Sequence, residues 1–97
     1  MYDLNSFQRD MLVIVGGMEG PDGTDIRREL EEYYPEEITA GRVYPQLTEL
    51  ADKGLINKQS RGRENKYWLT ERGVAELQHR REWEETYLGP VDQLSKW

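Results

Sequence analysis

The sequence contains no cysteine, and histidine occurs only once in its 97 residues, as His79. Without cysteine the chain has no disulfide framework, no cysteine-based zinc site and no thiol to sense oxidation. A single histidine leaves no cluster of transition-metal ligands. His79 lies among Gln78, Arg80 and Arg81, which is typical of a solvated side chain. We therefore expect no catalytic residue, no metal site and no cofactor.

The chain also lacks a long apolar run and a signal-peptide pattern, so we expect a soluble, cytoplasmic protein that does not enter a membrane. The glycine-rich stretch VGGMEGPDG at 15–23 lacks the Gly-Lys-Ser/Thr ending of a phosphate-binding loop. It also follows a predicted helix rather than a strand, so we interpret its Gly-Pro-Asp-Gly part as a turn.

Positive charge is scarce and unevenly distributed. The chain has 19 acidic and 13 basic residues, a net charge of −6, whereas nucleic-acid binders usually show a basic patch. Residues 42–68 hold six basic and three acidic residues, a net of +3, so the rest of the chain carries −9. Either this is a chance fluctuation or the protein has a basic face on an acidic body.

Apolar residues at helical spacing predict four helices. They span 6–18, from Asp22 or Thr24 to about Tyr34, from Thr39 to Lys53, and from Thr70 to about Tyr87. Asn5 can cap the first helix, and Pro35 stops the second. We expect Val74 and Leu77 to be core residues of the fourth helix. Gly89-Pro90 should break that helix and leave 91–97 as a short helix or an arm.

Between the third and fourth helices, two extended segments at 55–60 and 66–69 flank a polar turn. The pattern predicts a β-hairpin with a basic tip. The side chains expected there are Arg61, Arg63, Asn65 and Lys66. They can neutralise phosphates or enter a minor groove, although an ordinary polar turn would have a similar composition.

The order helix, helix, helix, hairpin, helix matches a winged helix-turn-helix domain, mostly α with a small β-hairpin. We expect a single domain over 1–97. Within it, 6–69 form the helix-turn-helix and wing, and 70–97 form a C-terminal helix and tail for dimerisation.

The stretch AGRVYPQL at 40–47 places a proline inside the third predicted helix. If Thr39 caps the helix, Pro45 lies just past the first turn, where proline costs least. Val43 and Leu47 belong to the buried stripe, so Arg42, Tyr44 and Gln46 should be exposed. Arginine can bind guanine with two hydrogen bonds and glutamine can pair with adenine. The alternative is a solvated helix face.

Two stretches resemble the PadR-like transcriptional regulators. GRVYPQLTELADKGLI at 41–56 is similar to their recognition-helix region, and RENKYWLTERG at 63–73 is similar to their wing strand and the following turn. The resemblance runs from about Phe7 to Leu77 and implies a dimeric winged-helix DNA-binding regulator, usually a repressor. It implies that Arg42, Tyr44 and Gln46 lie on the recognition helix and that Arg61, Arg63 and Lys66 belong to the wing. We therefore predict a DNA-binding surface of Thr39, Gly41, Arg42, Tyr44, Pro45 and Gln46 on the recognition helix, with Arg61, Arg63, Asn65 and Lys66 on the wing. The chain is short and acidic, which resembles the small haloarchaeal members.

Aromatic and apolar residues recur in the second half of the fourth helix and in the tail, where so small a domain offers no obvious partner. These residues are Trp83, Tyr87, Leu88, Leu94 and Trp97. One exposed patch of this kind would be costly, so we interpret it as a homodimer interface rather than a segment that folds back.

We therefore predict a homodimeric regulator that binds a pseudo-palindromic site in double-stranded DNA, with inorganic cations as possible further partners at high salt. The competing hypothesis is a winged-helix module that binds proteins and has no specific affinity for DNA. An enzyme is a distant third.

Overall fold

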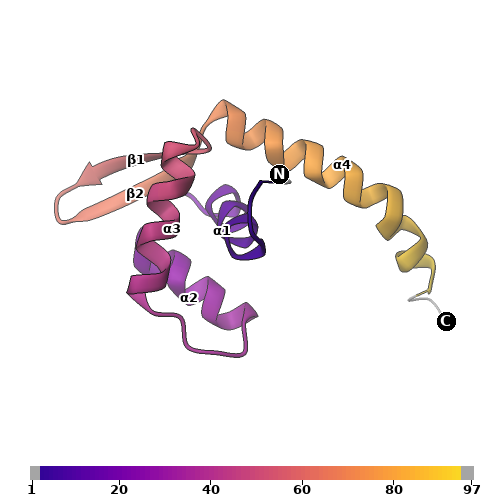
Figure 1. Cartoon of the computed structure of the whole chain (residues 1–97), viewed down its shortest axis with the longest axis horizontal. Coiled ribbons are helices and arrows are strands. Elements are labelled where there is room, and N and C mark those ends of the chain that lie inside the picture. The colour runs from indigo at the N-terminus through magenta and orange to yellow at the C-terminus, as the bar shows by residue number, and fades with distance from the viewer. Residues whose placement is uncertain (1–2, 95–97) are drawn as a thin grey trace.

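The computed structural model describes residues 3–94. Three helices form the body, a hairpin extends to one side of it, and the last helix reaches out to the other (Figure 1). The elements are α1 (Ser6–Gly17), α2 (Gly23–Tyr33), α3 (Ala40–Asp52), β1 (Ile56–Arg61), β2 (Glu64–Leu69) and α4 (Glu71–Leu94). This order confirms the predicted winged helix-turn-helix. Over 3–94, no helix is long and apolar enough to cross a membrane.

Side chains cap the first two helices at their N-termini. Asn5 accepts from the backbone N–H of Gln8, whose side chain accepts from the Asn5 N–H in return. Asp22 and Asp25 make the same reciprocal pair at the start of α2. Each pair satisfies amides that have no partner within the helix. Of the two caps considered for α2, the structure uses Asp22 rather than Thr24.

The third helix begins after Thr39, as predicted, but the Thr39 side chain makes no capping hydrogen bond. Instead, the Thr39 carbonyl oxygen accepts from both the Arg42 and the Val43 N–H, which tightens the first turn. Pro45 then lies inside a continuous helix, where its ring removes the hydrogen bond to the Gly41 carbonyl. Both residues are exposed, so water can satisfy that carbonyl.

The core lies where the first three helices meet the base of the hairpin. It contains Leu4, Phe7, Met11, Leu12, Val15, Ile26, Leu30, Ile38, Val43, Leu47, Leu50, Leu55, Ile56 and Tyr67. The stripe predicted for α3 from Val43, Leu47, Leu50 and Ala51 is confirmed for the first three, which are each at most 1% exposed, whereas Ala51 is only partly buried.

The hairpin is tighter than predicted. Its register pairs Ile56 with Leu69 and Arg61 with Glu64, which leaves two residues in the turn. Gly62 is the first of them and has φ of 65°, the conformation that a type II′ turn requires there. A main-chain hydrogen bond joins the hairpin to the body, in which the Tyr67 N–H donates to the Pro21 carbonyl oxygen at 3.0 Å, and the Ile56 and Tyr67 side chains pack into the core.

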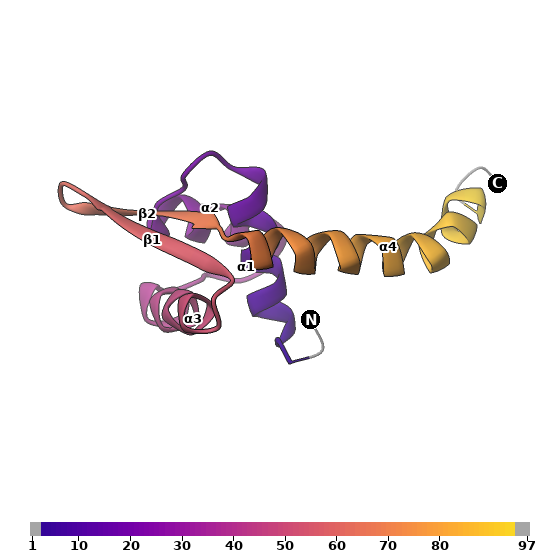
Figure 2. The ribbon, with the colours of Figure 1, turned by 90° about the horizontal axis from the view of Figure 1, so that it is seen from above.

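The last helix starts against the hairpin and then leaves the body. The Thr70 hydroxyl accepts from the Gly73 N–H at 3.0 Å, and a Cβ at position 73 would collide with the Leu55 carbonyl oxygen. Val74 is 41% exposed, so its predicted core position was wrong; Leu77 is only partly buried against the core. The outer half of α4 projects far from the other helices (Figure 2).

The predicted break at Gly89-Pro90 was also wrong, because α4 continues through Pro90 to Leu94. Proline removes one helical hydrogen bond, but α4 is exposed here and water can satisfy the freed carbonyl. Proline commonly bends a helix, and Figure 2 shows that the last turns of α4 deviate from its axis.

Candidate nucleic-acid interface

The face of α3 opposite the core is polar and open. Gly41, Pro45, Thr48 and Asp52 follow one another at helical spacing and are all exposed. Arg42 and Tyr44 flank this row on its two sides. Figure 2 views α3 nearly along its axis and shows the hairpin beside it. Sequence reasoning missed Thr48, although its place one turn after Pro45 could have revealed it.

Arg42 is held in place although it is exposed. Its guanidinium lies 4.1 Å from the centroid of the Phe7 ring, and Nη1 donates to Glu36 Oε1 at 2.8 Å. Tyr34, whose ring lies 5.9 Å from the guanidinium, donates from its hydroxyl to Asp10 Oδ2 at 2.5 Å. Burial and the Asp10 carboxylate raise the pKa of Tyr34 to about 12, so the phenol keeps its proton at neutral pH. The guanidinium is therefore oriented before any ligand arrives.

On the other flank, Tyr44 packs against the start of α2. A Cβ at Gly23 would overlap the Tyr44 hydroxyl, so glycine is needed for this contact. A cleft of about 200 Å³ opens beside it between α2, α3 and the hairpin. Its lining consists of Asp22, Gly23, Thr24, Tyr44, Arg63, Glu64 and Asn65. The cleft thus brings a predicted recognition-helix residue next to two predicted wing residues.

Gln46 is half-buried rather than exposed, because it faces α1. Its Oε1 accepts from Gln8 Nε2 at 2.8 Å, and the same nitrogen donates to Glu49 Oε2 at 2.7 Å. No local sequence pattern indicates these two hydrogen bonds, which join residues 38 and 41 positions apart. The predicted exposure of Gln46 was therefore wrong in part.

The basic residues of the hairpin differ in their exposure and in their ion pairs. Arg61 and Arg63 are exposed at the tip, with the Arg61 guanidinium 5.7 Å from the centroid of the Trp68 ring. Lys66, by contrast, lies 3.3 Å from a Glu64 carboxylate oxygen and 3.9 Å from one of Asp22. The tip therefore presents two arginines, while Lys66 is turned toward the body.

Asn65 is half-buried, and its Oδ1 accepts from the Ser60 hydroxyl across the hairpin. Lys58 on β1 is exposed and lines a shallow site with Thr48 and Asp52 of α3. The sequence placed Lys58 in the basic window without assigning it a role. Its position beside α3 makes it a further basic residue of this face.

A second, apolar surface lies on α4, far from the hairpin. Trp83, Tyr87, Leu88 and Leu94 are between 48% and 68% exposed, and Val91, which the sequence analysis did not single out, is 50% exposed. The centroids of the Trp83 and Tyr87 rings lie 5.2 Å apart. Trp97, the remaining residue predicted for this surface, lies outside the described residues.

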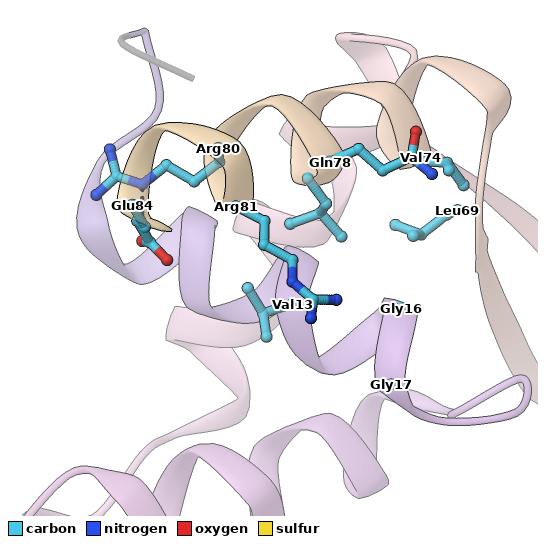
Figure 3. A pocket seen from close by; sticks show the side chains of 10 residues that line it. Val13, Gly16, Gly17, Leu69, Val74, Gln78, Arg80, Arg81 and Glu84 are labelled. Carbon is cyan, nitrogen blue, oxygen red and sulfur yellow. Dashed lines mark hydrogen bonds and ion pairs between the residues drawn. The ribbon is translucent and has the colours of Figure 1, made fainter. Parts of the chain in front are cut away.

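An open groove of about 620 Å³ runs between α1 and the first turns of α4 (Figure 3). Val13, which is 57% exposed on α1, faces α4 across it, and Gly16 and Gly17 form part of its floor. Val74 and Leu69 supply the opposite apolar wall. The groove and the α4 surface leave much apolar area of this chain uncovered.

Within residues 3–94, no group of three or more His, Cys, Asp or Glu side chains is placed to hold a metal ion. His79 is exposed on α4.

Known proteins share both the sequence pattern and the fold. A family model described as the transcriptional regulator PadR-like family matches residues 11–79, which include α2, α3 and the hairpin. No curated protein sequence matches the chain significantly.

Three solved structures illustrate the similarity. The structure of H. salinarum RosR grown from NaBr is 36% identical, covers 97% of this chain and 92% of that chain, and has a TM-score of 0.83. The complex structure of hsRosR-S1 is 38% identical, covers 98% and 86% of the two chains, and has a TM-score of 0.86. A PadR-like transcription factor from Bacteroides fragilis shares the fold, with 20% identity over 90% and 87% of the chains and a TM-score of 0.72. The resemblance noted in the two sequence motifs is thus confirmed, and the chain belongs to the transcriptional regulator PadR-like family.

Proposed function

We propose that the chain is a cytoplasmic, sequence-specific DNA-binding regulator that acts as a repressor on a pseudo-palindromic operator. The observation that carries this proposal is the cleft that Tyr44 of α3 and Arg63 of the hairpin line together. This cleft supports assigning α3 as the reading helix and the hairpin as the wing, because simultaneous contact with a groove and its adjacent backbone requires the two to lie side by side. The proposal involves no catalytic step, metal or cofactor.

In this proposal the N-terminal half of α3 enters the major groove. Arg42 pairs with guanine and Gln46 with adenine, while Pro45 and Gly41 allow the helix to approach the base edges closely. Thr39 and Tyr44 contact the phosphates on either side. On the wing, Arg61, Arg63 and Asn65 bind the backbone or the minor groove, and Lys66 supports them from the middle of β2.

The chain acts as a homodimer of single-domain protomers in this proposal. A second copy covers the α1–α4 groove and the aromatic surface of α4, since Trp83, Tyr87 and Leu88 would otherwise remain in water. Such an interface uses the same patch on both protomers, and its two-fold axis requires an operator with two related half-sites.

Carboxylates on the DNA-facing side suggest a role for inorganic cations. Glu49 and Asp52 on α3 and Glu64 on the wing would lie near phosphates, where like charges repel. At molar salt, cations held between these carboxylates and the phosphates would offset the repulsion, and their uptake would oppose the usual release of counterions.

The test is selection of an operator from a random duplex pool, followed by affinity measurements with Arg42→Ala. We expect two half-sites, and a loss of about 1–3 kcal/mol for the variant with relaxed preference at one base position in each half-site. An equal loss on every sequence would make Arg42 a phosphate contact. Failure of the folded wild type to select any sequence would favour the protein-binding module instead.

A further inference from the structure

Gln8 is a buried polar side chain beneath the reading helix. It is 2% exposed and is the only buried polar or charged residue within 3–94. It lies in the first turn of α1, where its Oε1 accepts from the Asn5 N–H at 3.2 Å as part of the helix cap. A polar side chain in this position is stable only if all its polar atoms have partners.

The remaining polar atom of Gln8 reaches across to α3. Nε2 donates one hydrogen bond to Gln46 Oε1 at 2.8 Å and another to Glu49 Oε2 at 2.7 Å. These two acceptors lie one turn apart on α3, so one amide group fixes both. The Gln8 side-chain oxygen thus caps α1, and its nitrogen orients the Gln46 and Glu49 side chains of α3.

We propose that Gln8 is a positioning residue that sets the base preference of α3 through Gln46 and Glu49. This inference rests on the proposed DNA-binding function. With Oε1 directed toward Gln8, the Gln46 amide nitrogen is the donor left for a base, and its oxygen keeps a second lone pair. Bidentate pairing with adenine needs this amide plane to be fixed, because donor and acceptor must match together.

The hydrogen bond from Gln8 Nε2 also holds the Glu49 carboxylate toward α1. A carboxylate on a reading helix can accept from the cytosine amino group, but it repels phosphate oxygens. Holding one of its oxygens on Gln8 leaves the other to face a base and limits the directions in which the charge can point. Side chains ordered before binding also lose less rotamer freedom when the complex forms.

A merely structural role for Gln8 would give a different result, because its two functions use different atoms. Gln8→Glu keeps the oxygen that caps α1 but replaces the donor with a second oxygen beside Glu49. Asn5→Ala is the matched control, since it removes the cap from the other side and leaves Gln8 Nε2 in place. Both variants should lose stability, but only Gln8→Glu should change which sequences are bound.

The experiment measures affinity of the full chain for the selected operator, its single-base variants and an unrelated duplex at one KCl concentration. Circular dichroism establishes folding of each variant. We expect Gln8→Glu to lower the ratio of operator to unrelated affinity by about tenfold, within the range that one base contact provides. Affinity for the unrelated duplex should stay within about twofold of wild type, and Asn5→Ala should retain the wild-type ratio.

Rescue makes the test specific. Adding Glu49→Gln to Gln8→Glu restores a donor between positions 8 and 49 but leaves Gln46 Oε1 without its donor, so the double variant should recover part of the ratio measured for Glu49→Gln alone. If Gln8→Glu does not fold, Gln8→Met takes its place and is compared with Asn5→Ala. An unchanged ratio in the folded Gln8 variant, an equal fall in Asn5→Ala, or no rescue would overturn the inference. A wild-type protein without operator preference would instead refute the proposed function and this inference with it.

Discussion

Replacing Glu36 with glutamine should tighten operator binding, because Glu36 competes with DNA for Arg42. The Arg42 Nη1 to Glu36 Oε1 distance is 2.8 Å, and the two side chains are 43% and 56% exposed. An ion pair this exposed is worth about 0.2–1 kcal/mol. Since about 1.4 kcal/mol corresponds to tenfold in affinity, freeing Arg42 should raise operator affinity by at most about fivefold.

Glu37→Gln is the matched control for the lost charge. Glu37 is the next residue, is exposed, and makes no ion pair within residues 3–94. Both variants remove one negative charge near the DNA and should weaken long-range repulsion equally. Only Glu36→Gln also releases Arg42, and the guanidinium should keep its orientation because it still lies against the Phe7 ring.

Fluorescence anisotropy with a labelled operator, at about 0.15 M and about 1 M KCl, separates the two effects. The Debye length falls from about 8 Å to about 3 Å over this range. The gain in Glu37→Gln should therefore vanish at the higher salt, whereas part of the gain in Glu36→Gln should persist. Equal behaviour of the two variants at both salts, or weaker binding by Glu36→Gln, would refute this reasoning.

Four other perturbations test separate parts of the protein. Arg61→Ala with Arg63→Ala should weaken binding to all duplexes. The slope of log affinity against log salt should become shallower by about 1.8, at about 0.9 per phosphate contact, and an unchanged slope in a KCl titration would remove the wing from the interface. Trp83→Ala should weaken the dimer in analytical ultracentrifugation; a wild-type monomer at micromolar concentration would contradict the proposed interface. Gly73→Ala should destabilise the fold by about 1–3 kcal/mol in chemical denaturation because its Cβ meets a backbone oxygen, whereas Gly89→Ala enters open space and should not. Operator binding should persist at molar KCl, and affinity should fall less steeply with salt concentration than the basic contacts alone imply. A steep loss of affinity that is complete well below molar salt, while circular dichroism shows an intact fold, would exclude cation uptake.

Features governed by neighbouring residues were predictable from the sequence. Asn5 caps α1 through residues three positions away, and Gly54 ends α3 with φ of 76°, a conformation that favours glycine. The stripe of Val43, Leu47 and Leu50 follows the helical repeat alone. These signals sufficed to order the elements and to locate the reading helix.

Contacts between distant segments could not be predicted in this way. Gln46 turns toward Gln8, and Lys66 toward Asp22, because of how the elements cross, which no local pattern encodes. Arg42 was correctly expected to be exposed, but its contact with Phe7 depends on the packing of α1 against α3. The continuation of α4 through Pro90 reflects its exposure, since a penalty that is large in a buried helix is small where water replaces the lost bond.

The bond between the Tyr67 N–H and the Pro21 carbonyl oxygen joins two main-chain atoms. No substitution of either side chain removes the acceptor, and only proline at position 67 would remove the donor. A two-stranded hairpin is barely stable alone in water, so this attachment matters for the order of the wing. This point of attachment is therefore insensitive to the side chain at position 21, while the core packing of Ile56 and Tyr67 completes it and the exposed tip residues Arg61 and Arg63 take no part in it. Duplicated copies of such a gene could diverge in DNA preference at the tip without losing the geometry that presents it.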